Sequence, residues 1–188
     1  NQTHANLELI VVDDFSSDQT CAVVERYMTL DPRIKLIKNT KNCGPYISRN
    51  VGIAHSSGPF IAIHDADDAA LPDRLALQRE AFTGGTVAVL GSHLRFDSSG
   101  CVALENDGSI LGHGPMTLIF ARHVIDELGS FAEVRTRGDK EFESRLENFY
   151  GAHTVKRLSD VVTLSLHSHD SNSHTHTKSA GLRHDLMR

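Results

Sequence analysis

The chain has 188 residues, of which 39% are hydrophobic and 23% are charged, and its formal net charge is −5. This length and composition predict one globular domain with a sizeable core. The acidic balance, without any block of Lys and Arg, argues against nucleic acid as a main partner. No apolar run approaches the roughly 20 residues that a membrane span needs, and no signal peptide opens the chain. The three cysteines, Cys21, Cys43 and Cys101, are widely spaced, which indicates reduced thiols and a cytoplasmic protein.

Strands and helices are expected to alternate over the first half of the chain, which is typical of βαβ units and a mainly parallel sheet. Ile47, Val51 and Ala54 mark one face of the second helix. The expected elements are a strand at 7–12, a helix containing 23–28, a strand at 34–37, a helix at 47–54, a strand at 59–63 and a helix at 72–82.

The pattern changes after residue 85. We expect a long strand at 87–96, a loop-like stretch at 98–114, a strand at 117–120, a helix at 123–128 and a last strand at 161–166. Phe142, Leu146 and Phe149 stripe a further helix that ends at Gly151. The single domain is therefore divided into a nucleotide-binding βαβ half (1–85), an acceptor and catalytic half (86–166) and a histidine-rich tail (167–188).

An acidic run directly follows the strand at 59–63. Asp65, Asp67 and Asp68 place three carboxylates within four residues. In open α/β sheets, ligands bind at the carboxyl edge of the strands. Like charges packed together need neutralisation, and a divalent cation such as Mg²⁺ or Mn²⁺ commonly supplies it. The alternative is a solvated acidic turn that caps the next helix. His64, just before the run, is expected to pack against the sheet.

Two further acidic positions have two interpretations each. Asp13 and Asp14 end the first strand, so in a parallel sheet they lie at the same edge as the acidic run. They either contact the hydroxyls or ring nitrogens of a ligand or serve in helix capping and in the turn itself. Asp139, at the start of the helix with Phe142, either caps that helix or takes a proton from an attacking hydroxyl. The motif alone leaves both possibilities open.

Taken in order, these segments resemble the family-two glycosyltransferases of the GT-A fold, which are inverting enzymes that use nucleotide-sugar donors. The resemblance implies an α/β fold with a mixed, mostly parallel central sheet flanked by helices, from which the first strand of the family is absent. The matching segments are VVDDFSSDQT (11–20), NCG (42–44), SRNVGIA (48–54), DADD (65–68), LPDRL (71–75), residues 117–129, GD (138–139) and RL (145–146).

The resemblance also implies a role for each candidate residue. The final acids of the metal-binding motif are not assigned uniformly among relatives, so Asp67 ranks before Asp68. His169 fits a histidine that approaches the metal or diphosphate in some GT-A enzymes, although an exposed histidine in the tail is the alternative. The implied nucleotide-binding residues are Asp13, Asp14, Arg49 and Asp65, the metal ligands are Asp67, Asp68 and His169, and the general base is Asp139.

The expected function is therefore metal-dependent, inverting transfer of a sugar from a nucleotide-sugar donor, foremost a UDP-sugar, to a saccharide or other hydroxyl acceptor. The expected cofactor is Mn²⁺ or Mg²⁺, and the setting is polysaccharide or glycoconjugate synthesis in the cytoplasm, including the inner face of the membrane, together with other domains of a longer protein. One alternative is a catalytically incomplete nucleotide-binding or scaffold domain. A phosphohydrolase of the haloacid dehalogenase type is disfavoured because Ala69 stands where that family requires Thr or Val.

Overall fold

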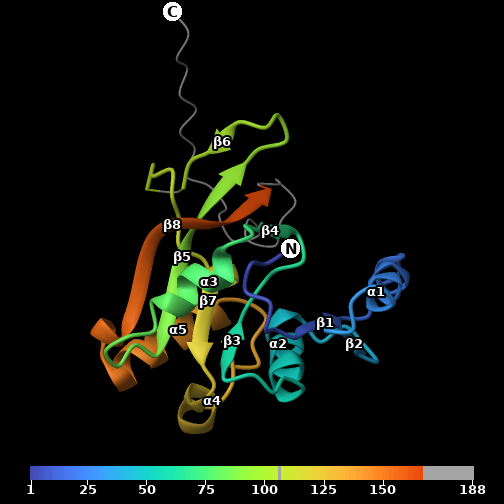
Figure 1. The fold of residues 1–188 in the computed structure, drawn as a ribbon, viewed down its shortest axis with the longest axis horizontal. Helices are drawn as coiled ribbons and strands as arrows, with labels where there is room; N and C mark the ends of the chain where they lie inside the picture. Colours follow the sequence, from blue (N-terminus) through green and yellow to red (C-terminus); the bar gives the residue numbers. More distant parts are fainter. Residues whose placement is uncertain (106, 167–188) are drawn as a thin grey trace, which may run out of the picture.

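The structure is a computed structural model that describes residues 1–105 and 107–166 (Figure 1). No helix in these two ranges has the length and apolar character needed to cross a bilayer. The first half contains β1 (Leu9–Asp13), α1 (Thr20–Met28), β2 (Ile34–Lys38), α2 (Pro45–Ala54), β3 (Phe60–Ala62), β4 (Asp68–Ala70) and α3 (Arg74–Glu80). The second half contains β5 (Ala88–Phe96), β6 (Val102–Ala103), β7 (Leu118–Ala121), α4 (His123–Leu128), α5 (Gly138–Tyr150) and β8 (Val155–Leu166), with short 3₁₀ turns at Pro115–Thr117 and Ala152–Thr154.

The strands form two sheets. β1 and β2 are a parallel pair, and a six-stranded sheet has the order β3-β7-β5-β8-β4 with β6 beside β5. Within this second sheet only β5 and β8 run parallel, and the other neighbours are antiparallel. The mixed sheet is confirmed, but the expectation that it is mostly parallel is wrong for the described strands. The alternation of strands and helices does not carry over to the order of strands in the sheet, because β3, β4 and β5 each pair with an antiparallel strand from a later part of the chain.

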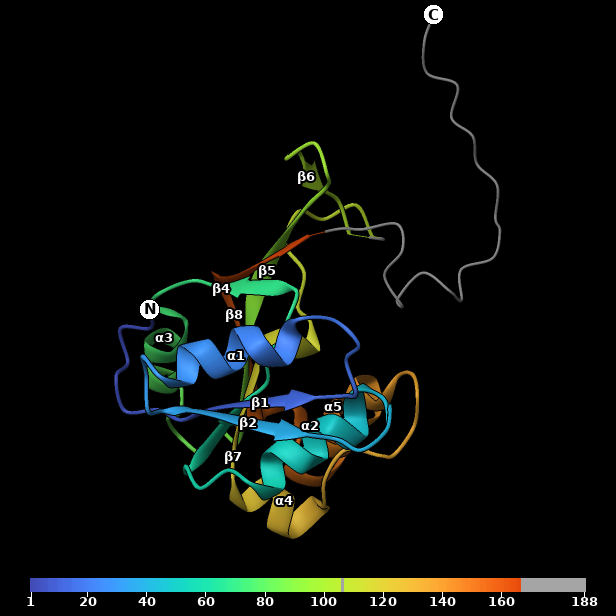
Figure 2. The ribbon, with the colours of Figure 1, turned by 90° about the vertical axis from the view of Figure 1, so that its right-hand side faces the viewer.

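The pair β1–β2 lies beside the six-stranded sheet, with α1 packed along it (Figure 2). Glu8, just before β1, ties the two sheets together at the start of β3. Its Oε1 accepts hydrogen bonds from the amides of Ser57 (2.5 Å) and Gly58 (3.2 Å). The hydrogen bond from Lys35 is the largest cause that lowers the pKa of Glu8 to about 2.

The core lies between the six-stranded sheet and the helices. Figures 1 and 2 together place α3 on one face of this sheet and α5 on the other. Phe142 of α5 is fully buried, and its ring centre lies 5.2 Å from that of Phe120 and 4.3 Å from that of Phe131. Phe149, which was expected on the same stripe, is 60% exposed. It lies near the end of α5, beyond the turns that meet the sheet.

The buried face of α2 differs from the expected one. Tyr46 and Ile53 are buried, whereas Ile47 and Val51 are only half-buried and Ala54 is exposed. Ile47 and Val51 nevertheless follow a helical spacing, so the expectation located the helix correctly. The difference arises because α2 packs against β1 on one side and against the aromatic core on the other. The side that faces the core carries Tyr46, the largest side chain of the helix.

Candidate active site

The acidic run places its three carboxylates in different surroundings. Asp65 Oδ1 lies 2.6 Å from Arg49 Nη2 in an ion pair. Asp67 is exposed and accepts no hydrogen bond from the part of the chain that the structure describes. Asp68 is half-buried at the start of β4, opposite Ser165 of β8, and burial raises its pKa. The run is therefore not a uniformly solvated turn, because one acid is paired, one is open to solvent and one faces inward.

A buried arginine stands behind the run. Arg74 is only 2% exposed and donates a hydrogen bond to the Ile63 carbonyl at 2.6 Å. Its Nη1 lies 2.9 Å from His64 Nδ1, and His64 is exposed rather than packed against the sheet as expected. Burial lowers the pKa of Arg74 to about 10, while the charges of Asp68 and Asp65 act in the opposite direction. The guanidinium thus stays charged at neutral pH and offsets part of the negative charge of the run.

Asp14 joins the end of β1 to the start of α2. Its Oδ1 accepts hydrogen bonds from the Asn39 side chain (2.9 Å) and the Cys43 amide (2.8 Å), and its Oδ2 accepts one from the Gly44 amide (2.7 Å). Burial alone would raise the pKa of Asp14, but these hydrogen bonds outweigh it and lower the pKa. The Cys43 and Gly44 amides precede α2, which begins at Pro45 without a side-chain cap, so Asp14 makes turn contacts before α2 and caps neither α1 nor α2.

Asp13 is buried next to it, with 6% of its surface exposed. Its Oδ2 accepts a hydrogen bond from the Ser16 amide at 3.3 Å, and its Oδ1 has no partner among residues 1–105 and 107–166. A buried oxygen without a donor costs free energy, so this oxygen can take a donor from a ligand. Asp14 Oδ2 also has capacity for one further donor. Contact of either acid with a nucleotide base stays a prediction.

Asp139 lies in the first turn of α5. The helix follows Arg137, whose φ of 62° is left-handed, and no side chain caps it, so the capping interpretation of Asp139 is wrong. The Oδ1 atom of Asp139 instead accepts a hydrogen bond from the Tyr46 hydroxyl at 2.7 Å. Gly138 allows this approach, because a Cβ at that position would lie 2.9 Å from the Tyr46 ring.

All three acidic positions contact one short stretch, residues 43–49 at the start of α2. Tyr46 and Arg49 lie one turn apart on the same side of the helix, and Arg49 Cζ is 5.1 Å from the centre of the Tyr46 ring. The structure therefore brings together acids that lie far apart along the chain. The three contacts are those of the Cys43 and Gly44 amides with Asp14, of Arg49 with Asp65, and of Tyr46 with Asp139.

Two residues of this arrangement were missed by sequence reasoning. Tyr46 precedes Arg49 by three positions, which is a signal that both share one helix face. Arg74 lies in the LPDRL segment, but nothing in that segment indicates that its guanidinium is buried behind the acids.

The residues expected to bind a metal do not form a cluster of ligands in the described part of the chain. No group of three His, Cys, Asp or Glu side chains is arranged to hold a metal within the described ranges. Mg²⁺ and similar ions often take only one or two carboxylates and complete their shell with substrate phosphates and water. The exposed, unpartnered carboxylate of Asp67 fits that mode. His169 and the rest of the tail lie outside the described residues, so the expected role of His169 stays a prediction.

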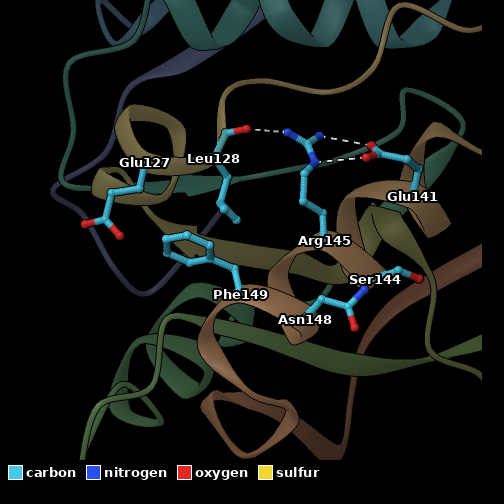
Figure 3. A pocket seen from close by; sticks show the side chains of 7 residues that line it. All are labelled: Glu127, Leu128, Glu141, Ser144, Arg145, Asn148 and Phe149. Carbon is cyan, nitrogen blue, oxygen red and sulfur yellow. Dashed lines mark hydrogen bonds and ion pairs between the residues drawn. The ribbon is translucent and has the colours of Figure 1, made fainter.

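A separate hollow of about 610 Å³ lies between α4 and α5. Figure 3 shows Arg145 reaching toward the Leu128 carbonyl and the Glu141 carboxylate, with an Arg145 Nε to Glu141 Oε1 distance of 2.9 Å. None of the candidate site residues lines this hollow, so it is distinct from the arrangement around α2. Its lining residues are Glu127, Leu128, Glu141, Ser144, Arg145, Asn148 and Phe149.

Known sequences resemble part of the chain. The model of the family described as glycosyl transferase family 2 matches residues 1–125. An uncharacterized glycosyltransferase of Haemophilus influenzae is 47% identical over 72 residues, which cover 38% of this chain and 22% of that protein. The succinoglycan biosynthesis protein ExoO of Rhizobium meliloti is 41% identical over 90 residues, covering 47% of this chain and 25% of the relative. The match thus spans no more than a quarter of either relative.

Solved structures resemble most of the described fold. S. aureus TarS in complex with UDP superposes with a TM-score of 0.65 at 22% identity, covering 86% of this chain and 51% of the TarS chain. The mannosyltransferase PcManGT from Pyrobaculum calidifontis, in complex with GDP-Man and Mn²⁺, has a TM-score of 0.61 at 19% identity and covers 86% of this chain and 47% of its own. These similarities confirm the expected α/β GT-A fold.

Proposed function

Since the chain belongs to glycosyl transferase family 2, we propose that it forms the donor site and carries the general base of a metal-dependent, inverting glycosyltransferase. Its main support is the convergence of the three acidic positions on α2. Asp14, Asp65 and Asp139 come from separate parts of the chain, yet all contact residues 43–49. Acids placed in this way can serve the two halves of the reaction, one group holding the nucleotide and another accepting the proton of the attacking hydroxyl.

The donor side comprises the acids nearest β1 and β3. Asp13, with its unpartnered buried oxygen, and Asp14 are proposed to accept hydrogen bonds from the nucleotide base, while Asp65 faces the ribose and Arg49 holds Asp65. Asp67 is the first candidate metal ligand. When bound there, Mn²⁺ or Mg²⁺ supplies positive charge against the leaving diphosphate.

Asp68 is the second candidate metal ligand and His169 the third. Asp68 is half-buried, and burial raises its pKa, whereas the Asp67 carboxylate is exposed. The exposed carboxylate meets a hydrated cation more readily, which supports ranking Asp67 before Asp68.

The acceptor side centres on Asp139. The acceptor oxygen forms a new bond to the anomeric carbon of the sugar while the bond from that carbon to the diphosphate oxygen breaks, and the electron pair leaves with the nucleoside diphosphate. The proton of the acceptor hydroxyl passes to the Asp139 carboxylate. One displacement from the face opposite the leaving group inverts the configuration, and no covalent enzyme intermediate is needed.

The substrates proposed are a UDP-sugar and a saccharide or other hydroxyl acceptor in polysaccharide synthesis. The UDP bound to TarS supports the nucleotide, and the succinoglycan relative supports the acceptor class. The free thiols of Cys21, Cys43 and Cys101 support a reducing, cytoplasmic setting.

Isothermal titration of UDP, GDP and dTDP, each with Mn²⁺, tests the donor site. We expect metal-dependent binding that Asp67→Ala abolishes. Asp73→Ala is the matched control, because Asp73 is exposed, follows the acidic run closely and makes no capping hydrogen bond. If no nucleotide binds, the proposed function is wrong.

Asp139→Asn tests the chemical step separately from binding. This variant should keep the nucleotide affinity of the unaltered protein and lose turnover, because the amide cannot accept the proton. Turnover that survives in Asp139→Asn would show that another group is the base. Nucleotide binding without turnover in the unaltered protein would favour a binding or scaffold domain.

A further inference from the structure

We propose that Tyr46 is a positioning residue for Asp139, holding the carboxylate of the general base in the orientation that receives the acceptor proton. This inference rests on the proposed role of Asp139. The Tyr46 hydroxyl donates a hydrogen bond of 2.7 Å to Asp139 Oδ1, across 93 positions of the chain. The Asp139 side chain accepts no other hydrogen bond from the described residues, so Tyr46 fixes one oxygen and leaves the other for the acceptor.

The Tyr46 ring has little freedom to turn away. It is 7% exposed and lies 6.1 Å, centre to centre, from the Phe131 ring. Arg49 covers it at 5.1 Å, and the Gly138 backbone approaches it so closely that a Cβ would lie 2.9 Å from the ring. The ring is therefore enclosed by the core, by its own helix and by the start of α5. Its hydroxyl is directed at Asp139 by packing rather than by the hydrogen bond alone.

Tyr46 also acts as a donor at neutral pH. Burial, and the hydrogen bond to Asp139, raise the pKa of Tyr46 above its ordinary value of 10.0. The phenol thus keeps its proton at neutral pH. It donates a hydrogen bond to Asp139 without transferring the proton, so the carboxylate stays negatively charged. A donor of this kind orients a base without consuming its capacity to accept a proton.

Arg49 connects Tyr46 to an acid of the proposed donor site. Arg49 lies over the Tyr46 ring and pairs with Asp65 at 2.6 Å. Asp139 and Asp65 are thus linked through two side chains on one helix face. Placement of the base is coupled by packing to placement of the acid proposed for the ribose.

Tyr46→Phe tests the inference, because it keeps the ring and its packing and removes only the hydroxyl. Tyr150→Phe is the matched control, since the Tyr150 hydroxyl also donates to a carboxylate, that of Glu127 at 2.7 Å, at the far end of α5. The full-length protein is assayed with Mn²⁺ for release of nucleoside diphosphate from UDP-glucose, UDP-N-acetylglucosamine and GDP-mannose, with water and offered saccharides as acceptors.

We expect Tyr46→Phe to lower kcat between about tenfold and a hundredfold, as expected for a misplaced catalytic group, with the KM for the donor and the affinity for UDP unchanged. Tyr150→Phe should change none of these quantities. A kcat of Tyr46→Phe within twofold of that of the unaltered protein, or equal effects on kcat and UDP affinity, would overturn the inference.

A double-mutant cycle with Asp139→Asn distinguishes positioning from general damage. If Tyr46 acts through Asp139, Tyr46→Phe has no further effect on the small residual rate of Asp139→Asn, measured at high enzyme concentration, whereas independent effects multiply. Multiplying effects would overturn the inference while leaving the proposed function intact. Full activity of Asp139→Asn, or absence of turnover by the unaltered protein, would overturn the proposed function and the inference with it.

Discussion

Arg49 and Asp65 form a partly sheltered ion pair, with 2.6 Å between Arg49 Nη2 and Asp65 Oδ1 and with side chains that are 14% and 34% exposed. The same guanidinium lies over two rings, 5.1 Å from the centre of Tyr46 and 5.9 Å from that of Phe131. The Arg49 side chain therefore forms an ion pair with Asp65, which follows β3, and stacks on two aromatic rings.

Charge and shape at Arg49 can be separated by substitution. Arg49→Lys keeps the charge but loses the planar stacking and the fixed donor direction, and Arg49→Ala loses both. We expect the affinity for UDP with Mn²⁺ to fall about threefold in Arg49→Lys and about tenfold in Arg49→Ala, measured by isothermal titration. Arg79→Ala, at an exposed position on α3, is the control. Unchanged affinity in Arg49→Ala would exclude a role on the nucleotide side.

Asp14 makes part of the folding stability sensitive to acid. Its folded-state pKa is lowered from the ordinary 3.8, so its contribution is present above that pH and is lost as the pH falls through the folded-state value. At pH 7, Asp14→Asn should lower the free energy of unfolding by about 1–3 kcal/mol, because the amides of Cys43 and Gly44 lose a charged acceptor. In urea unfolding, the difference in unfolding free energy between Asp14→Asn and the unaltered protein should become smaller below about pH 4. A constant difference down to pH 2 would contradict this.

Gly138 is required by the close approach of α5 to Tyr46. Gly138→Ala places a Cβ 2.9 Å from the ring, and overpacking of this kind costs about 1–3 kcal/mol of unfolding free energy. The strain should also displace Asp139, so turnover falls while UDP affinity is kept. Thermal unfolding and titration measure the two effects. A variant as stable and as active as the unaltered protein would mean that α5 can shift without consequence.

Asp67 and Asp68 should differ in how much each contributes to metal-dependent binding of UDP. We expect EDTA to abolish UDP binding and added Mn²⁺ to restore it. Asp67→Asn should weaken Mn²⁺-dependent binding at least tenfold, on the order of one lost charged ligand. Asp68→Asn, whose carboxylate faces inward beside Ser165, should change UDP affinity less than threefold, on the order of 0.6 kcal/mol. The reverse order of effects would make Asp68 the main ligand.

Two phenylalanines of α5 should differ in their effect on stability. Phe142 is fully buried, and Phe142→Ala should cost about 3–5 kcal/mol of unfolding free energy through lost burial and an unfilled cavity. Phe149 is 60% exposed, and Phe149→Ala should stay within about 0.5 kcal/mol. Urea denaturation measures both. Similar costs would show that the exposed face of α5 is covered by another part of the protein.

The local elements were predictable because their signals are local. The helix expected at 123–128 is found as His123–Leu128, and the strand expected at 34–37 as Ile34–Lys38. β4 was not expected, because Asp68-Ala69-Ala70 has low strand propensity. It is a strand only because β8 pairs with it from almost a hundred residues away. The antiparallel pairs β3–β7 and β5–β7 are likewise formed between strands that lie well apart along the chain.

The acids of the site were predictable, but their partners were not. The acidic run 65–68 can be recognised from the sequence as a cluster of charge, without knowing how buried each side chain is. The role of Tyr46 depends on which face of α2 meets α5, and that of Arg74 on its being 2% exposed. Both depend on tertiary packing, which overrode the helix face indicated by Ile47 and Val51.

The side-chain contacts between α2 and the acids close chain loops of very different length. The one between Arg49 and Asp65 spans 16 residues, and the one between Tyr46 and Asp139 spans 93. Because the entropy of loop closure grows with the logarithm of loop length, the longer loop costs about 1.6 kcal/mol more to close. On loop entropy alone, the contact between Tyr46 and Asp139 is therefore the one of these contacts that costs the most free energy to close.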